Sequence, residues 1–226
     1  MTVVAIDGPV GSGKSAVARR VAARLGYVYL DTGAMYRAVG LLATEAGVPL
    51  DDEPAVLAAA AAAPLRFDGE GRLFAAQRDV STDIRTLEMA AAASRVSELP
   101  GVRRVLVDEQ RRLAGDAEIV MEGRDIGTNV FPDAAVKVFL TARPEVRAAR
   151  RAAELREAGG DVDDGRVLAA LRERDKRDST RAVAPLRRAA DATEVDTSGM
   201  TLDEVVDAVV DLVAATVGGG ASGDGA

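Results

Sequence analysis

The chain has 226 residues, of which 48% are hydrophobic and 29% are charged, and its formal net charge is −7. This composition predicts one folded α/β domain with a small insertion, and the negative charge argues against general nucleic-acid binding. No apolar run approaches the ~20 residues needed to span a bilayer. The sequence enters its first strand at once, without a basic and apolar leader, so we expect a cytoplasmic protein.

Cysteine and histidine are both absent from the sequence. The lack of cysteine excludes disulfides, thiolate metal sites and cysteine nucleophiles. The lack of histidine excludes any mechanism that uses imidazole as a base or a ligand. Lysine is rare, since only Lys14, Lys137 and Lys176 are lysines and the other basic side chains are arginines.

The first predicted strand, Val3–Ile6, leads directly into GPVGSGKS at residues 8–15. A G-x-x-x-x-G-K-[ST] pattern between a strand and a helix is typical of a phosphate-binding loop, or P-loop. Its glycines allow a sharp turn, and backbone N–H groups with the next helix N-terminus would bind phosphates. We expect Lys14 to contact the β- and γ-phosphates and Ser15 to hold Mg²⁺. The residues expected to bind the donor nucleotide are Gly8, Pro9, Val10, Gly11, Ser12, Gly13, Lys14, Ser15 and Ala16.

A helix is predicted over Lys14–Leu25, where Gly26 ends it, and a second strand over Tyr27–Leu30. Asp31 and Thr32 are typical residues for the start of the next helix, Ala34–Ala46.

The sequence LDTGAMYRAV carries several polar side chains at this second strand end. Thr32 and Tyr36 are four residues apart and would share one helix face. Arg37 lies one residue further round and would bind the phosphate of an acceptor as a planar fork. The alternative is that Asp31 or Thr32 only caps the helix and that Arg37 is solvated.

The middle of the chain departs from the strand–helix alternation. An alanine-rich helix is predicted over residues 51–63, and Pro64 stops it. Residues 65–80 alternate apolar and polar side chains around an Asp-Gly-Glu-Gly turn, which indicates a small antiparallel hairpin in an inserted subdomain. Helices are expected over about 86–98 and 102–113.

The alternation then resumes and predicts a parallel sheet with helices on both faces. The strands are expected at Glu118–Met121, Val136–Leu140 and Ala192–Val195. The helices are expected at Pro144–Glu157, Val162–Arg177 and Leu202–Val217. The glycine-rich residues 218–226 predict a disordered tail. In such sheets ligands bind beyond the carboxyl ends of the strands, where the P-loop, DTG and EGRD all fall.

EGRDIGTNVFPD, at residues 122–133, follows the third large strand. Glu122 would lie behind the Mg²⁺ site and act through water, while Arg124 and Asp125 would meet the ligand. The alternative is a turn with surface charges.

RERDKRDSTRAVAPL, at residues 172–186, places Arg174, Arg177, Asp178 and Arg181 near a helix end. There the arginines would bind phosphates or, alternatively, only oppose the helix dipole.

These motifs, in this order, resemble the bacterial cytidylate kinase family. The resemblance is carried by GPVGSGKS, LDTGAMYRAV, EGRDIGTNVFPDAAVKVFLTARPEVRAARR and RDSTRAVAPLRRAADATEVDTSG, and extends from about Val3 to Val217. It implies a three-layer P-loop kinase fold with five parallel strands in a single domain over residues 1–217. The core would span about 1–50 and 100–217, the inserted monophosphate-binding region about 51–99, and a short lid about 147–162.

The resemblance also implies an activity, which is transfer of a phosphoryl group from ATP to CMP or dCMP with Mg²⁺. Lys14, Arg124, Arg174 and Arg181 would be catalytic, and Ser94 and Arg103 would contact cytosine. The residues implied to bind the acceptor are Asp31, Thr32, Tyr36, Arg37, Ser94, Arg103, Arg124, Asp125, Asp178 and Arg181. The partners would be small nucleotides, without nucleic acid or membrane, and we expect a monomer.

The chain departs little from the family pattern. Asn129 stands where an apolar residue is more common, and Glu122 stands where Asp is also common. In the variable lid, Arg147, Arg150 and Arg151 are candidates for closing over ATP.

Three alternatives remain. A kinase of the same fold would act on another acceptor, such as UMP, AMP, shikimate or a nucleoside. A GTP-dependent switch would carry N-K-x-D, but the single asparagine, Asn129, is followed by Val130. A non-catalytic nucleotide-binding module is disfavoured by the intact Gly13-Lys14-Ser15.

Overall fold

The computed structural model describes residues 1–68, 70–157, 159 and 161–218. The chain forms two compact units. The first unit joins Met1–Tyr29 to the chain from Asp116 onward, and the second unit is Leu30–Gly115. The expected tail at 218–226 lies outside the described residues except for Gly218, as does Gly69 of the expected hairpin turn.

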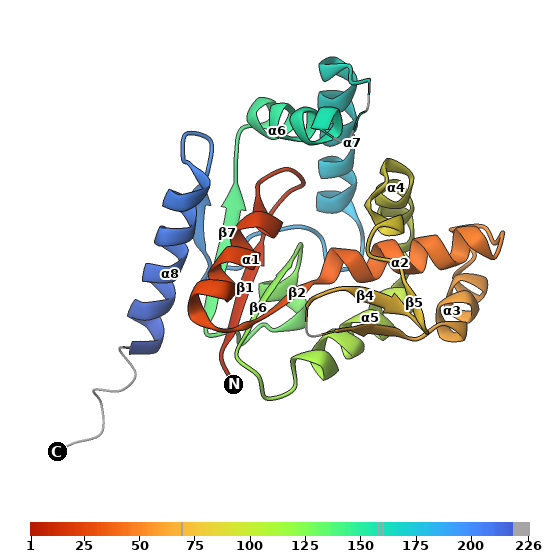
Figure 1. The fold of residues 1–226 in the computed structure, drawn as a ribbon, viewed down its shortest axis with the longest axis horizontal. Coiled ribbons are helices and arrows are strands. Elements are labelled where there is room, and N and C mark those ends of the chain that lie inside the picture. Colours follow the sequence, from red (N-terminus) through yellow and green to blue (C-terminus); the bar gives the residue numbers. More distant parts are fainter. Residues whose placement is uncertain (69, 158, 160, 219–226) are drawn as a thin grey trace. The chain divides into compact units, whose positions relative to one another are not determined.

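A five-stranded sheet has the order β2-β6-β1-β7-β8 (Figure 1). The strands are β1 Val3–Asp7, β2 Val28–Asp31, β6 Ile119–Gly123, β7 Val136–Thr141 and β8 Thr193–Asp196. Strand β1 pairs in parallel with β6 and β7, and β7 pairs in parallel with β8. The prediction of an α/β fold with a five-stranded parallel sheet is confirmed. The observed strand bounds differ from the predicted ones by one or two residues, which is within the uncertainty of strand ends.

The helices of the first unit are α1 Lys14–Leu25, α6 Pro144–Glu157, α7 Asp164–Thr180 and α8 Leu202–Gly218. Helix α7 continues three residues beyond the predicted end at Arg177, so that Asp178 lies within the helix and Arg181 follows it. A short π-helix, η2 Ile126–Val130, follows β6 and was not expected from the sequence.

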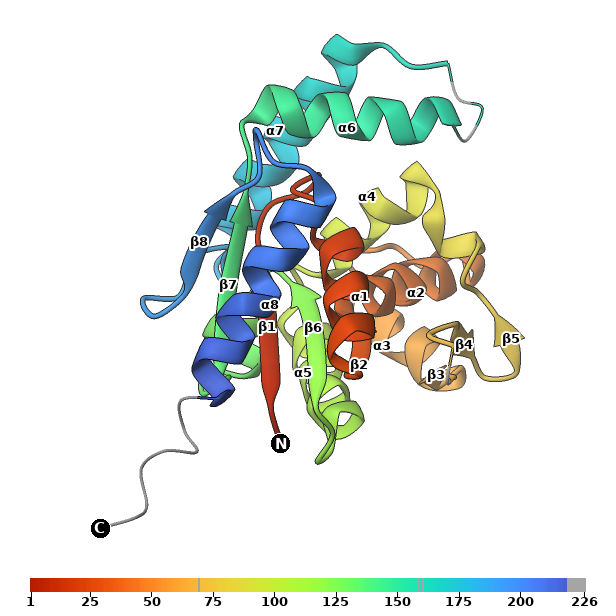
Figure 2. The same cartoon turned by 60° about the vertical axis from the view of Figure 1, so that its left-hand side comes forward.

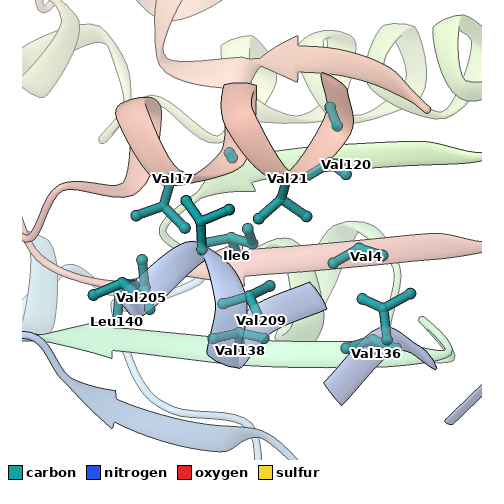
Figure 3. Packing of buried hydrophobic residues seen from close by; sticks show 14 residues of the cluster. Val4, Ile6, Val17, Val21, Val120, Val136, Val138, Leu140, Val205 and Val209 are labelled. Atoms are coloured by element: carbon teal, nitrogen blue, oxygen red, sulfur yellow. The ribbon is translucent and has the colours of Figure 1, made fainter. Parts of the chain in front are cut away.

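The core of the first unit lies between the sheet and two helices, α1 and α8, which run side by side in Figure 2. Because side chains alternate along a strand, Val4 and Ile6 of β1 point to the same face. There they meet Val17 of α1 and Val205 and Val209 of α8 (Figure 3). This apolar layer anchors the strand that leads into the P-loop.

The second unit is built around α2 Thr32–Glu45. One face of α2 packs with α3 Glu53–Ala62 and α5 Pro100–Ala114 through Met35 and Val39. Another face packs with α4 Leu87–Val96, and at Gly40 a side chain would stand only 2.8 Å from Ala92 Cβ. The absence of a side chain at Gly40 therefore allows the two helices to approach closely.

The predicted hairpin is present and has a third short strand. The strands β3 Leu65–Phe67, β4 Leu73–Ala75 and β5 Arg78–Asp79 form an antiparallel sheet in that order. A 3₁₀ turn, η1 Asp83–Arg85, connects this sheet to α4. The boundaries 51–99 for a nucleotide-binding insertion and 147–162 for a lid stay predictions.

None of the helices within the described residues combines the length and the apolar character that crossing a membrane requires.

Gly8 provides a test of the connection between β1 and the P-loop. Its φ is +150°, and an added Cβ would overlap the carbonyl oxygen of Leu140 in β7. We expect Gly8→Ala to lower the free energy of unfolding by about 1–3 kcal/mol, because the strand and loop must move apart. Denaturant unfolding measures this loss. Gly199→Ala is the matched control, since no atom lies within 4 Å of its added Cβ. Equal stability of the two variants would contradict the prediction.

Candidate functional site

The P-loop connects β1 to α1 and leaves the N-terminus of α1 without a side-chain cap. Gly11 and Gly13 have φ of +74° and +89°, which only glycine adopts readily. Gly13 is the N-cap residue, makes no capping bond through a side chain, and the first turn of α1 holds no acidic residue. The unsatisfied N–H groups and the positive end of the helix dipole therefore face the loop and favour an anion there.

Lys14 adds a buried positive charge at this place. Its ammonium donates to the carbonyl oxygen of Pro9 at 2.7 Å and to Ser12 Oγ at 3.4 Å. The pKa of Lys14 is lowered to about 7, mainly by burial and then by the charge of Arg124, while the charge of Glu122 acts in the opposite direction. A bound anion would reverse much of this effect, because it favours the charged form of the lysine.

The next side chain, Ser15, is exposed at the first turn of α1. Glu122, at the end of β6, is buried and accepts a hydrogen bond from the hydroxyl of Tyr29 at 2.6 Å. Within the part of the chain that the structure describes, no three Asp or Glu side chains converge on a ready-made metal site. A cation bound here would therefore keep water or ligand oxygens in its coordination shell.

Ion pairs between arginines and aspartates join the segment after β6 to α7 and the residue that follows it. Arg124 Nε donates to Asp178 Oδ2 at 3.0 Å, and Arg181 lies 3.4 Å from Asp125 Oδ1. Burial opposes ionisation of Asp178, but the positive charges of Arg124, Arg174 and Arg181 outweigh it and lower its pKa. The carboxylates thus hold the guanidinium groups in place without neutralising the whole cluster.

In the second unit, Asp31 combines two roles. Its Oδ1 accepts the backbone N–H of Ala34 at 2.9 Å, which is the helix cap of the alternative interpretation. Its Oδ2 lies 2.8 Å from Arg37 and 3.6 Å from Arg85. Arg37 is therefore held on a carboxylate and largely covered rather than solvated. Thr32 is buried at the start of α2.

Ser94 and Arg103, which are expected to contact cytosine, lie in α4 and α5 of the second unit. The guanidinium of Arg103 stands over the ring of Tyr36, 5.6 Å from its centroid, and donates to the carbonyl of Ser97 at 3.3 Å. The Ser94 hydroxyl is buried and has no hydrogen-bond partner among the described residues. A buried hydroxyl without a partner is costly in a folded chain and is expected where a ligand completes the contact.

The predicted site residues therefore divide between the units, and the structure brings them together within each. In the first unit these are Lys14, Arg124, Asp125, Arg174, Asp178 and Arg181, linked by contact or by charge. In the second unit these are the pairs Asp31 with Arg37 and Tyr36 with Arg103. Their roles in binding and catalysis stay predictions.

Arg147, one of the three lid candidates, is buried and bonded within the first unit. Its side chain is only 6% exposed and lies 2.7 Å from Asp175. It also donates to the backbone carbonyls of Val10, at 3.0 Å, and Ala142, at 2.9 Å. Arg147 thus braces the P-loop against α6 and α7, a contact between residues far apart in sequence that no local pattern predicts.

The other two lid candidates also have partners inside the first unit. Arg150 donates to Thr197 Oγ1 at 2.9 Å and to the Thr197 carbonyl at 2.7 Å. Arg151 pairs with Glu154, one turn along the same helix, at 2.8 Å.

Asp7 is a buried polar residue that the sequence analysis missed. Its two carboxylate oxygens accept the backbone N–H groups of Ile126 and Gly127 at 2.9 and 2.8 Å. Burial raises the pKa of Asp7 to about 6, although these two hydrogen bonds act in the opposite direction. The available signal was an acidic residue at the end of an apolar strand, directly before the first glycine of the P-loop.

Arg147→Met tests the brace under the P-loop. We expect a loss of about 3 kcal/mol in unfolding free energy, because the change leaves Asp175 and two carbonyls without their partner. Urea denaturation provides the measurement. Arg151→Met is the matched control on the same helix, with an expected loss below about 1 kcal/mol because its ion pair is largely exposed. A loss at Arg147 no larger than at Arg151 would reject the brace.

The sequence was compared with known families and proteins. The family described as cytidylate kinase matches residues 4–215. The cytidylate kinase of Pelotomaculum thermopropionicum is 49% identical over 216 residues, which cover 94% of this chain and 96% of that protein. The cytidylate kinase of Mycobacterium leprae is 51% identical over 212 residues, which cover 93% and 95%.

Among solved structures, a gluconokinase from Sinorhizobium meliloti 1021 is similar in fold alone. Its TM-score is 0.50 at 15% identity, and the match covers 98% of this chain and 97% of that one. The family match over nearly the whole length, and relatives with about half of their residues identical, show that this chain belongs to the cytidylate kinase family.

Proposed function

We propose that this protein transfers the γ-phosphoryl group of ATP to CMP or dCMP and produces CDP or dCDP for pyrimidine nucleotide metabolism. The observation that carries the proposal is the buried Lys14 at an uncapped helix N-terminus, with Arg124 close enough to lower its pKa. This concentration of positive charge suits a triphosphate that donates a phosphoryl group. The cytidine acceptor is supported by the family and by relatives that carry the name cytidylate kinase.

The donor is bound by residues Gly8–Ala16. The backbone N–H groups of the loop and the start of α1 take the phosphates, and Lys14 exchanges its contact with the Pro9 carbonyl for phosphate oxygens. Ser15, whose side chain is exposed at the start of α1, would hold Mg²⁺. The cation would supply positive charge that neutralises part of the phosphate charge.

The residues proposed to contact the acceptor are found in each of the two units. Asp31 holds Arg37 in the orientation that grips a phosphate, and Thr32 and Tyr36 lie on the same helix. Ser94 and Arg103 contact the cytosine, while Asp125 and Asp178 reach the sugar or the base. Arg124 and Arg181 bind the acceptor phosphate.

Catalysis consists of positioning and of charge compensation. The acceptor phosphate is already an anion, so it needs no strong base, which agrees with a sequence without histidine. The main obstacle is repulsion between two phosphate groups. Lys14, Arg124, Arg174 and Arg181 compensate it and stabilise the charge that spreads over the transferring group. The arginines are held in advance by Asp125 and Asp178, so little reorganisation is needed.

We further propose that the protein acts in the cytoplasm as a monomer with small nucleotides as its partners, and that it binds no nucleic acid. The net charge of −7 supports the last point.

A panel of acceptors tests the reaction. With ATP and Mg²⁺, we expect kcat/KM to be higher for CMP and dCMP than for UMP or AMP, measured as ADP release in a coupled assay.

Lys14→Ala should lower kcat by orders of magnitude, because it removes a charge that acts on the transferring phosphoryl group. Its circular dichroism spectrum controls for folding. Equal turnover of all acceptors would reject the cytidine assignment, and near-normal activity of Lys14→Ala would reject the P-loop role.

Ser94→Ala tests the base contact separately from the donor site. We expect kcat/KM for CMP to fall about tenfold, which corresponds to one lost hydrogen bond, with the KM for ATP unchanged. Ser97→Ala is the matched control, because the hydroxyl of Ser97 already donates to the carbonyl of Ser94 at 2.8 Å. An unchanged kcat/KM for CMP in Ser94→Ala would remove this residue from the acceptor site.

A further inference from the structure

Asp7 joins two loops that end neighbouring strands of the sheet. It is the last residue of β1, and strand alternation points its side chain to the face opposite Ile6. There it accepts the N–H groups of Ile126 and Gly127, the first two residues of η2. The first N–H groups of a helix lack partners within the helix, so Asp7 satisfies two of them from 119 and 120 residues away.

The loop that Asp7 holds carries charged side chains of the arginine cluster. Arg124 and Asp125 stand directly before η2. Arg124 pairs with Asp178 in α7, and Asp125 pairs with Arg181, the residue that follows α7. On the other side, Asp7 is followed immediately by the P-loop, and the charge of Lys14 acts on its carboxylate. One buried carboxylate therefore connects the backbone that precedes the predicted donor site to the backbone that carries two predicted acceptor contacts.

We propose that Asp7 is a positioning residue for phosphoryl transfer, whose ionised carboxylate holds the Arg124–Asp125 loop in its active arrangement through the N–H groups of Ile126 and Gly127. The inference rests on the proposed kinase function. Asp7 touches neither nucleotide in this scheme. It acts by fixing the backbone from which the side chain of Arg124 extends. A displacement of about 1 Å at a reacting centre can lower the rate about a hundredfold.

The arrangement depends on the protonation of Asp7. Two oxygens accept two N–H groups only while both are unprotonated, since a proton turns one of them into a donor. The pKa of this carboxyl is raised to about 6, mainly by burial and to a smaller extent by the charge of Asp125, while the two backbone hydrogen bonds and the charge of Lys14 oppose the rise. The other charged side chains on the neighbouring strands are Glu122, bonded to Tyr29, and Lys137, bonded to Asp191. As the pH falls through about 6, one of the two hydrogen bonds is lost.

Asp7→Asn tests the proposal with nearly unchanged size. The amide offers one acceptor and turns an NH₂ group toward the second N–H, so it imitates the protonated state at every pH. We expect kcat with CMP at pH 8 to fall about tenfold to a hundredfold, while the KM for ATP changes little. Asp207→Asn is the matched control, because Asp207 is an exposed residue of α8 that pairs with Arg24. It should keep wild-type kinetics.

The pH profile separates this role from a merely structural one. The phosphate of CMP itself titrates near about pH 6, so the comparison is between variants. Wild type and Asp207→Asn should lose kcat as the pH falls through about 6, whereas Asp7→Asn should lack this step and keep the titrations of the substrate and of Lys14. An Asp7→Asn variant with wild-type kcat and an unchanged pH profile would overturn the proposal.

A third measurement requires neither an activity assay nor a variant protein. In ¹⁵N-labelled wild-type protein without nucleotide, the amide signals of Ile126 and Gly127 should shift together with pH, with a midpoint near 6. Their hydrogen exchange should accelerate below that pH beyond the intrinsic trend. Amides that show neither effect would overturn the inference. If they titrate as expected but the wild type phosphorylates no nucleotide, the proposed function fails and the Asp7 contact stands.

Discussion

The structure of the P-loop depends on a positive charge that is buried before any ligand is present. Lys14 lies at the uncapped N-terminus of α1, and its burial lowers its pKa. Such a charge is unfavourable unless hydrogen bonds or an opposite charge compensate it. Glycines with positive φ shape the turn, and Arg147 stabilises it by donating a hydrogen bond to the Val10 carbonyl. The anion that completes this arrangement is the phosphate tail of the proposed donor.

A second theme is that carboxylates hold arginines in place. Asp31 holds Arg37 in the second unit, and Asp178 holds Arg124 in the first. Each pair fixes the direction of a planar guanidinium before a phosphate arrives, which reduces the entropy lost on binding. Asp7 extends this principle to the backbone, since its partners are N–H groups of the loop that carries Arg124. The network favours rigid positioning over a strong acid or base, which agrees with phosphoryl transfer to an anionic acceptor.

Local patterns predicted much of the fold. Strand β1, the glycine loop and helix α1 follow from a short apolar run, glycine spacing and helical periodicity, all within about 25 residues. The antiparallel region at 65–79 followed from alternation, although its third strand, β5, was too short to show a pattern. The π-helix η2 escaped prediction because its N–H groups are satisfied by Asp7, far away in the sequence.

The sequence by itself determined the phosphate-binding loop, the α/β class and the family of this protein, because each depends on residue types at fixed short spacings. The tertiary structure alone decided which charges meet. It placed Arg147 in contact with the Val10 carbonyl of the P-loop, and it brought Asp7 to the N–H groups that begin η2. The reason is physical: a buried charge takes its partners from whatever the fold brings near, and the pairs Asp7–Gly127 and Arg147–Val10 are more than a hundred residues apart in the chain.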